Sequence, residues 1–351
     1  MKEQAGILEA VPGKRLFLAI IADYDLNRSI CELIDNAIDN WIKNGKGKKL
    51  LIDINIDTTQ QSIQIVDNSG GIKEDQLKNV ISPGETSNDP MSKVIGIFGV
   101  GTKRAVIALS TDVKIISRFK DKSTFLVEFD NTWLQENNDW NLPYHRVDNI
   151  EPSTTNIKLQ SLRYGINGDM LKRLKEHLQV TYAKFLKVNK LEIKLNDEII
   201  ESKLFEDWAY PPSYEPTQYS GKIKTDDGTI NIKIISGLTQ KSSPAGEYGV
   251  YFYCNNRLIA KALKSFEVGF GTGLAGKPHA SISLMRVIVF LEGSAKLMPW
   301  NSSKSDIYYE HKVHLKLRDI LIKIVKQYAK ISKGLGKSEG GWPENVFKYP
   351  L

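Results

Sequence analysis

The sequence predicts an α+β protein with two domains. Helical and strand patterns alternate through the first half of its 351 residues, and a second set of strand patterns is followed by a helix near the C-terminus. A chain of this length exceeds what one domain usually reaches, and its 41% hydrophobic and 25% charged residues are ordinary for globular proteins. We therefore expect two cores, with a boundary near Leu162–Gly168.

Composition excludes several classes of protein. Apolar stretches such as Leu16–Ile21 and Val287–Leu291 fall far short of the roughly 18 residues that a bilayer span requires, so we expect neither a membrane span nor a signal peptide. Two cysteines and five histidines without metal-ligand spacing argue against a disulfide framework or a thiolate metal site. These features favour a cytoplasmic location. The net charge of +7 permits a polyanionic partner without indicating one.

The first half begins with an amphipathic helix that ends at Lys43, capped by Asn27 or Ser29. The segments Leu50–Asp57 and Ser62–Asp67 alternate as strands across a four-residue turn, which is typical of a hairpin. A pair of glycines then ends the second strand, and the next helical segment follows. The remaining elements expected here are a short helix at Lys73–Ile81, a helical run at Ala105–Leu109, and strands at Val113–Arg118, Phe125–Phe129 and Asn156–Leu159.

The segment Ser82–Lys93 is rich in Gly, Pro, Ser and Asn and lacks periodicity, so we expect a mobile loop. In the second half, the pattern predicts one long helix at Gly168–Lys187 and a terminal helix from about Ile307 to Ser332. The tail after Gly334 should be irregular. The strands expected in this half are Leu191–Leu195, Glu198–Ile200, Lys222–Lys224, Ile230–Ser236, Gly249–Cys254 and Val287–Leu291.

The first helix carries a polar stripe. At about 100° per residue, Glu32, Asn36 and Asp39 fall on one side of the helix, and its apolar residues fall on the other. Taken alone, such a stripe is most often a solvated helix face. It indicates chemistry only if a second element converges on it.

Two further segments could converge on this stripe. The strand Ser62–Asp67 ends in the carboxylate of Asp67, and the glycines that follow, Gly70 and Gly71, let the backbone approach a ligand closely. A glycine-spaced segment later precedes a helical run, where backbone amides favour phosphate. It is not a Rossmann fingerprint, because a loop rather than a strand precedes it. Its candidate phosphate-binding residues are Gly96, Gly99, Val100, Gly101, Thr102 and Lys103.

In order and spacing, these segments resemble the GHKL superfamily of ATPases, which includes gyrase, the ninety-kilodalton chaperone, histidine kinases and MutL. The resemblance implies a Bergerat-type α/β sandwich that binds ATP and magnesium. It covers the chain from Glu32 to Leu159. Glu32–Asn40 resembles the N box, Asp67–Gly71 the adenine motif, Gly96–Gly101 the glycine motif of the lid, and Thr155–Leu159 the last nucleotide motif.

The resemblance implies a role for each matched residue. Asp67 would accept the exocyclic amine of adenine, assisted by Thr155, which selects ATP over GTP. Asn36 would offer an oxygen to magnesium, and Asp39 would belong to the same nucleotide site. Glu32, one helical turn from Asn36, would act as general base on the attacking water.

A second resemblance concerns the C-terminal half. Gly249–Leu258 and the segment from Met298 to Ile307 look like parts of the transducer domain of microrchidia-type members. In those proteins a lysine of the second domain reaches the terminal phosphate, which implies a catalytic role for Lys304, with Lys103 as the alternative. The expected division is an ATP-binding domain at 1–165, an S5-like transducer domain at 166–335 and a tail at 336–351.

Two positions depart from the superfamily pattern. Ser69 stands where the adenine motif usually has glycine, and Asn40 follows Asp39 where alanine is usual. Neither change removes a group expected to touch phosphate or metal. We therefore expect nucleotide binding to survive, with altered contacts around the base.

The resemblance implies an ATP-hydrolysing switch in which closure of the Ser82–Lys93 loop drives homodimerisation. The N-terminal segment Met1–Asp25 could reach across to the second subunit or pack on its own domain. By analogy, the switch would act on DNA or a DNA-bound partner protein, in a restriction-like or defence system if the source is bacterial. The basic residues that could face DNA, or equally form solvated helix faces, are Lys172, Arg173, Lys175, Lys184, Lys187, Lys312, Lys316, Arg318, Lys323, Lys326, Lys330 and Lys333.

Two other functions remain open. An ATP-sensing module that does not hydrolyse ATP would place Glu32 or Lys304 out of reach of the γ-phosphate. A histidine-phosphorylating kinase is disfavoured, because no phosphoacceptor helix precedes the N box and the Lys304 domain follows.

Overall fold

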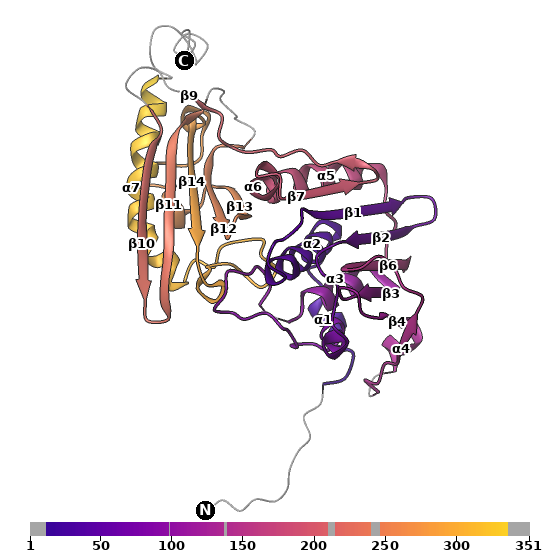
Figure 1. The fold of residues 1–351 in the computed structure, drawn as a ribbon. Helices are drawn as coiled ribbons and strands as arrows, with labels where there is room; N and C mark the ends of the chain where they lie inside the picture. The colour runs from indigo at the N-terminus through magenta and orange to yellow at the C-terminus, as the bar shows by residue number, and fades with distance from the viewer. Residues whose placement is uncertain (1–11, 98, 137–138, 210–214, 240–245, 336–351) are drawn as a thin grey trace, which may run out of the picture. The chain divides into compact units, whose positions relative to one another are not determined.

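The computed structural model describes residues 12–97, 99–136, 139–209, 215–239 and 246–335 (Figure 1). The chain forms two compact units, each with its own large sheet, which confirms a mixed helix and sheet protein. The expected tail at 336–351 lies outside the described residues. The first unit comprises Met1–Glu85, Gly99–Leu174 and Ile193–Ile199; the second comprises Thr86–Phe98, Lys175–Glu192 and Ile200–Leu351.

The first unit is built on an eight-stranded sheet in the order β5-β4-β3-β6-β2-β1-β7-β8. Its central strands pair antiparallel, and the alternating residues of β1 are buried on one face. The strands are β1 (Leu50–Asp57), β2 (Ser62–Asp67), β3 (Ser110–Arg118), β4 (Thr124–Phe129), β5 (Tyr144–Val147), β6 (Thr154–Leu162), β7 (Leu191–Leu195) and β8 (Glu198–Ile199).

Two helices of this unit pack against each other and against the sheet: α2 (Leu26–Lys43) contacts α3 (Gly101–Leu109) and β1, and α3 contacts β3 and β6. The apolar side of α2 is fully buried, as its periodicity predicts. Its N-cap is Asp25, whose carboxylate accepts from the Arg28 amide at 2.8 Å, so the expected cap at Asn27 or Ser29 is wrong. The shorter helices are α1 (Leu16–Ile20), η1 (Glu74–Val80) and α4 (Asn131–Gln135).

The described part of the N-terminal segment packs on its own unit. Phe17 is 2% exposed and its ring lies 5.5 Å from that of Trp140. The Lys14 ammonium lies 3.6 Å from the ring centroid of Trp133 and donates to the Trp133 carbonyl at 2.6 Å. In this single chain, residues 12–25 thus pack on their own domain, which is one of the two expected arrangements. Residues 1–11 lie outside the described part.

The second unit contains a sheet in the order β10-β11-β14-β12-β13, with β9 paired to β11. In this sheet β12 and β14 pair in parallel, whereas β11 pairs antiparallel with β10, β14 and β9, and β12 pairs antiparallel with β13. The strands are β9 (Trp208–Ala209), β10 (Thr217–Thr225), β11 (Gly228–Thr239), β12 (Gly249–Cys254), β13 (Arg257–Leu263) and β14 (Met285–Glu292).

Helix α7 (Lys312–Leu335) packs on β10, β11 and β14 of this sheet and also contacts η2 (Phe266–Val268) and η3 (Ala280–Ile282). The short helix η4 (Ala295–Leu297) contacts β11. A core of Val180, Phe205, Trp208, Tyr251 and Tyr253 belongs to the same unit. The expected single helix at 168–187 is wrong in one respect: it is divided at Tyr182 into α5 (Gly168–Thr181) and α6 (Ala183–Lys187). Within the described residues, no helix is both long enough and apolar enough to span a membrane.

Candidate functional site

The polar stripe of α2 is buried rather than solvated. Glu32 is 3% exposed and Asp39 is 1% exposed, and Asn36 is half-buried between them in the stripe. Burying two carboxylates costs free energy unless other groups compensate it, so a solvated helix face does not explain this stripe. The arrangement favours a functional site along this side of α2.

The start of α3 is the second element that converges on the polar stripe of α2. The Asn36 side-chain amide donates to the Thr102 hydroxyl at 2.8 Å. Gly101, the first residue of α3, lies so close to Glu32 that a Cβ on Gly101 would stand 2.3 Å from Oε2 of the carboxylate. Val100 precedes the helix and has no side-chain oxygen that could cap the first-turn amides. Gly101 and Thr102 of this turn lie beside Glu32 and Asn36.

Asp67 lies at the end of β2, directly opposite Thr155 in the β2–β6 ladder. Thr155 is opposite Ser117 in the β3–β6 ladder, and their hydroxyls are 3.0 Å apart. These three side-chain positions form one row across three strands. Sequence reasoning missed Ser117, which would have required knowledge that β3 and β6 are neighbours.

The Asp67 carboxylate is buried, with 8% exposure, and burial raises its pKa to about 6. The Ser69 amide donates to Oδ1 at 2.9 Å and opposes this rise by stabilising the charged form. A buried carboxylate of this kind can accept from a ligand donor when it is ionised. This is the property expected of an adenine-binding aspartate.

The two residues that depart from the superfamily pattern contact each other. The Asn40 side-chain amide donates to the Ser69 hydroxyl at 2.9 Å and to the Gly71 carbonyl at 3.1 Å. Gly71 has φ +71°, and a Cβ there would lie 2.0 Å from the Arg118 carbonyl oxygen. Only glycine fits at Gly71, while Asn40 and Ser69 together shape the turn that follows Asp67.

Lys103 is 2% exposed and joins both ends of the excursion that the chain makes between residues 85 and 99. Its ammonium donates to the carbonyls of Glu85 at 2.7 Å and Gly99 at 2.6 Å, and the Gly84 amide also donates to the Gly99 carbonyl at 3.1 Å. Burial lowers the pKa of Lys103 to about 8. In this structure Lys103 therefore holds the two ends of the loop together through hydrogen bonds.

The loop expected at Ser82–Lys93 is irregular, as predicted, but its second part is hydrogen-bonded within the second unit. The Pro90 carbonyl accepts from the Lys296 amide at 3.0 Å, and the Ser92 carbonyl accepts from the Ala295 amide at 2.9 Å. Gly96 also belongs to this second-unit segment and accepts from the Asn88 side chain. Phe98, within the same glycine motif, lies outside the described residues.

Lys304 lies in a tight loop of the second unit, with a left-handed φ of +52°. The Asn301 carbonyl accepts from its amide at 3.0 Å, and the guanidinium of Arg257 donates to its carbonyl at 2.7 Å. The two segments that resemble a transducer domain thus meet at Arg257 and Lys304.

Asn36 supplies a neutral side-chain oxygen of the kind that magnesium accepts. The described residues contain no group of three or more His, Cys, Asp and Glu side chains that could hold a metal alone. The side-chain nitrogen of Asn36 donates to Thr102. The side-chain oxygen of Asn36 is therefore the atom that would bind the metal. The donor set therefore fits magnesium that takes most of its ligands from nucleotide phosphates and water.

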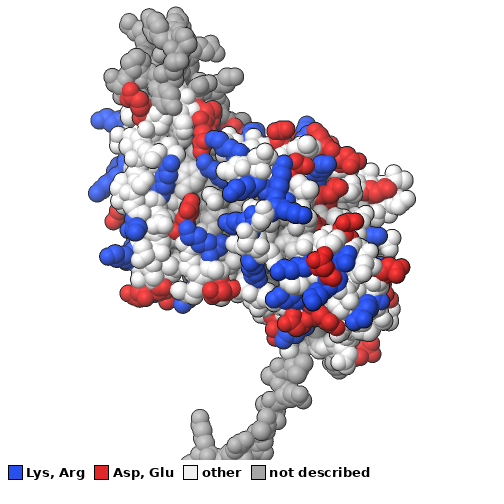
Figure 2. Space-filling model, viewed as in Figure 1, with Lys and Arg blue, Asp and Glu red and all other residues white. Residues whose placement is uncertain are grey.

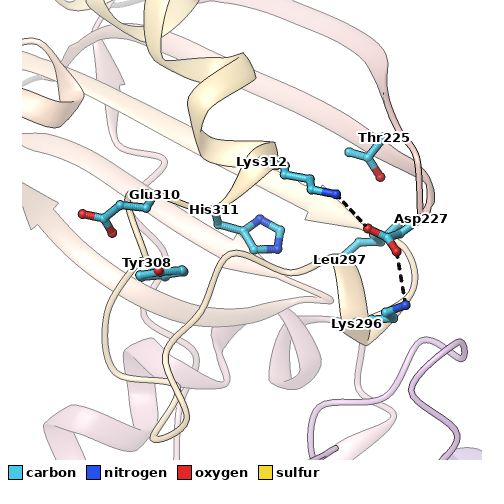
Figure 3. Close-up of a pocket in the computed structure, with 8 residues that line it drawn as sticks. All are labelled: Thr225, Asp227, Lys296, Leu297, Tyr308, Glu310, His311 and Lys312. Atoms are coloured by element: carbon cyan, nitrogen blue, oxygen red, sulfur yellow. Dashed lines mark hydrogen bonds and ion pairs between the residues drawn. The ribbon is translucent and has the colours of Figure 1, made fainter.

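A separate pocket of about 230 Å³ lies at the start of α7 (Figure 3). Lys296 and Lys312 reach Asp227 from two sides, at 3.2 and 3.3 Å, so both lysines of the pocket are paired with this carboxylate. Leu297, Tyr308 and His311 also line it. It contains none of the residues expected to bind nucleotide.

Comparison with known proteins agrees with the first-unit geometry. Residues 24–162 match the family model described as histidine kinase-, DNA gyrase B- and HSP90-like ATPase. A search of curated proteins finds no match. The matched segment runs from Tyr24 to Leu162 and includes the polar stripe, Asp67, the start of α3 and Thr155. It supports the GHKL superfamily for this part of the chain and implies ATP binding.

Proposed function

We propose that the protein is a GHKL-type, microrchidia-like ATPase that hydrolyses Mg-ATP and uses it as a switch. The observation that carries this proposal is the burial of Glu32 and Asp39 on the side of α2 that meets the start of α3. In this proposal the first unit is a Bergerat-type nucleotide domain, and the second contains an S5-like transducer domain. The division at 1–165, 166–335 and 336–351 belongs to the same proposal.

Adenine recognition is assigned to Asp67 and Thr155, which are paired across β2 and β6. The ionised Asp67 carboxylate would accept from the exocyclic amine of adenine. A guanine carbonyl at the same place would face a carboxylate with no shared proton, and such a buried mismatch typically costs several kcal/mol. The site therefore selects ATP over GTP.

Hydrolysis is assigned to the opposite end of the site. The backbone amides from Gly99 to Thr102, which lead into the first turn of α3, would bind the β and γ phosphates. Magnesium held by Asn36 and the phosphates would neutralise phosphate charge. Glu32 would remove the proton from the attacking water, a role typically worth roughly 10²–10⁴ in rate, and Lys304 would stabilise charge on the transferred group.

The switch is assigned to the segment Thr86–Phe98. The residues that flank it, Glu85 and Gly99, are held by Lys103 in the first turn of α3, and its middle is hydrogen-bonded to Ser294–Lys296. A phosphate that attracted the Lys103 ammonium would compete with the carbonyls of Glu85 and Gly99. Nucleotide state would thereby reach the second unit and, in this proposal, the dimer interface.

DNA, or a DNA-bound partner, is the proposed target by analogy alone. Several α7 lysines are engaged within the protein: Lys316, Lys326 and Lys333 donate to the carbonyls of Lys224, Gly273 and Ala275. Figure 2 shows basic and acidic side chains interspersed over the viewed face. Binding to a duplex should therefore be tested by fluorescence anisotropy at two salt concentrations, because binding driven by phosphate contacts weakens steeply with salt.

The proposal is tested by steady-state phosphate release. Wild-type protein with Mg-ATP should release phosphate, and Glu32→Ala should reduce turnover at least about tenfold, the low end of a general-base contribution. Glu176→Ala, in helix α5, is a control outside the proposed site and should keep wild-type turnover. Equal turnover in Glu32→Ala would remove Glu32 from the mechanism.

The alternative is an ATP-sensing module without hydrolysis. It would bind ATP with the same residues and release no phosphate above a no-protein control. Incubation with labelled ATP distinguishes the ATPase and the ATP-sensing module from a histidine-phosphorylating kinase, because only the kinase would leave a labelled phosphoprotein.

A further inference from the structure

Tyr24 contacts the proposed general base directly. Its hydroxyl donates to Oε1 of Glu32 at 3.2 Å, and the two side chains are 8% and 3% exposed. Burial raises the pKa of Tyr24 far above its usual range, and the neighbouring Glu32 charge raises it further. The hydroxyl therefore stays protonated and remains a hydrogen-bond donor at any physiological pH.

Helix α3 holds Tyr24 in place. The Arg104 guanidinium lies 4.3 Å from the centroid of the Tyr24 ring. The same side chain pairs with Asp23 at 3.0 Å and donates to the Ile20 carbonyl at 2.6 Å. Arg104 itself is 8% exposed, whereas the side chain of its partner Asp23 is 54% exposed. The helix whose first turn would bind phosphate also fixes the tyrosine.

The two oxygens of the Glu32 carboxylate have different surroundings. Oε1 receives the Tyr24 hydroxyl, whereas Oε2 lies beside Gly101, where a Cβ would stand only 2.3 Å away. Any side chain at Gly101 would have to displace Oε2. The carboxylate is thus held from one side by Tyr24 and given room on the other by glycine.

We propose that Tyr24 is a positioning residue that directs Oε2 of Glu32 toward the attacking water. This inference rests on the proposed ATP hydrolysis. The water oxygen bonds to the γ-phosphorus, and its proton passes to Oε2. The bond from the γ-phosphorus to the β–γ bridging oxygen breaks, and its electron pair leaves with ADP. Tyr24 itself gives up no proton.

The test compares Tyr24→Phe with wild-type protein. Loss of the hydroxyl should lower kcat about tenfold or more, because small misplacements of a reacting group are costly, while KM for ATP and the affinity for ATP stay unchanged. Tyr164→Phe is the matched control: the Tyr164 hydroxyl is buried in the same unit and has no hydrogen-bond partner among the described residues. It should leave kcat within twofold.

A second readout separates positioning from a structural role. In a Glu32→Gln background, Tyr24→Phe should cause no further loss of turnover, because the hydroxyl acts through the Glu32 carboxylate. Gly101→Ala keeps the Tyr24 hydroxyl and should also lower kcat by crowding Oε2. This variant tests the geometry even if Tyr24→Phe does not fold, which thermal unfolding would reveal.

The outcomes distinguish the two proposals. Absence of phosphate release by wild-type protein would overturn the proposed hydrolysis and this inference together. Wild-type turnover that depends on Glu32 but is unchanged in folded Tyr24→Phe would overturn the positioning role alone. If Tyr24→Phe does not fold, unchanged turnover in Gly101→Ala would overturn the positioning role.

Discussion

Asp67 shows how burial bears on the ligand recognition that is proposed for this residue. A carboxylate on the surface would keep its ordinary pKa, whereas burial raises the pKa of Asp67 to about 6. The charged form is thus unfavourable in the empty pocket and becomes useful only when a donor such as the adenine amine is present. Sequence alone placed this residue at a strand end but could not show that it is buried opposite Thr155.

We predict a pH dependence from this pKa. ATP affinity should fall about tenfold per pH unit as the pH drops below about 6, because protonated Asp67 no longer offers a carboxylate to the adenine amine. Calorimetric titration of ATP between pH 5 and pH 8 measures this. An affinity that stays constant over this range would argue against Asp67 as the adenine acceptor.

The same pKa has the opposite consequence for the empty protein. The native state binds a proton at Asp67 up to about pH 6, whereas the unfolded state releases it near the ordinary aspartate pKa of 3.8. Stability contributed by this group is therefore lost as the pH rises from about 4 to 6. Asp67→Asn should be more stable than wild type at pH 7 by up to about 3 kcal/mol, measured by urea unfolding. Reduced stability of this variant would contradict the assigned burial effect.

At the scale of elements, much of the fold follows from sequence patterns. Strands β1 and β2 have the boundaries that alternation predicts, and α2 ends at Lys43 as expected. Strand β12 also has its expected boundaries, although all its residues are buried. Strand β13 was not predicted, although Asn255 and Asn256 between β12 and β13 have φ of +47° and +69°, which suits a tight hairpin turn. The short elements α1, α4, β5 and β9 carry too few residues for a periodic signal.

The candidate site was predictable in part for the same reason. Local spacing identifies the α2 stripe, but Tyr24, Ser117 and Arg104 reach the site through tertiary contacts. The hydrophobic periodicity of the sequence does not predict such tertiary contacts. The gathering of α2, α3 and the end of β2 therefore had to come from resemblance to known ATPases or from the structure.

The connection between α2 and the turn after β2 gives an element-scale prediction. Asn40 donates to Ser69, and Asn44 donates to the Ser69 carbonyl at 3.2 Å. A double-mutant cycle of Asn40→Ala and Ser69→Ala should show a coupling energy of about 0.5–1.5 kcal/mol in urea unfolding, as expected for one hydrogen bond. Strict additivity of the two changes would mean that the pair does not couple helix and turn.

At the scale of the whole molecule, the chain crosses between its two units on either side of Thr86–Phe98. The crossing points at Glu85 and Gly99 are joined by Lys103 and by the Gly84 amide. A loop with such attachments differs from a freely moving lid. Its response to nucleotide would involve the second unit as well as the first.

We predict that a non-hydrolysable ATP analogue converts the protein to a dimer. Light scattering should give a mass near 39.6 kDa without nucleotide and about twice that mass with the analogue and magnesium. Asp67→Asn, which should not bind ATP, should stay monomeric under both conditions. A monomer at all analogue concentrations that saturate the site would remove dimerisation from the proposed switch.

The central claim is that α2, the end of β2 and the start of α3 form one ATP site in which binding and hydrolysis use different residues. Isothermal titration calorimetry with Mg-ATP on three proteins tests it most directly. Wild type and Glu32→Ala should bind one ATP per chain with similar affinity, and folded Asp67→Asn should show no binding. Normal affinity in Asp67→Asn, or loss of binding in folded Glu32→Ala, would contradict this account.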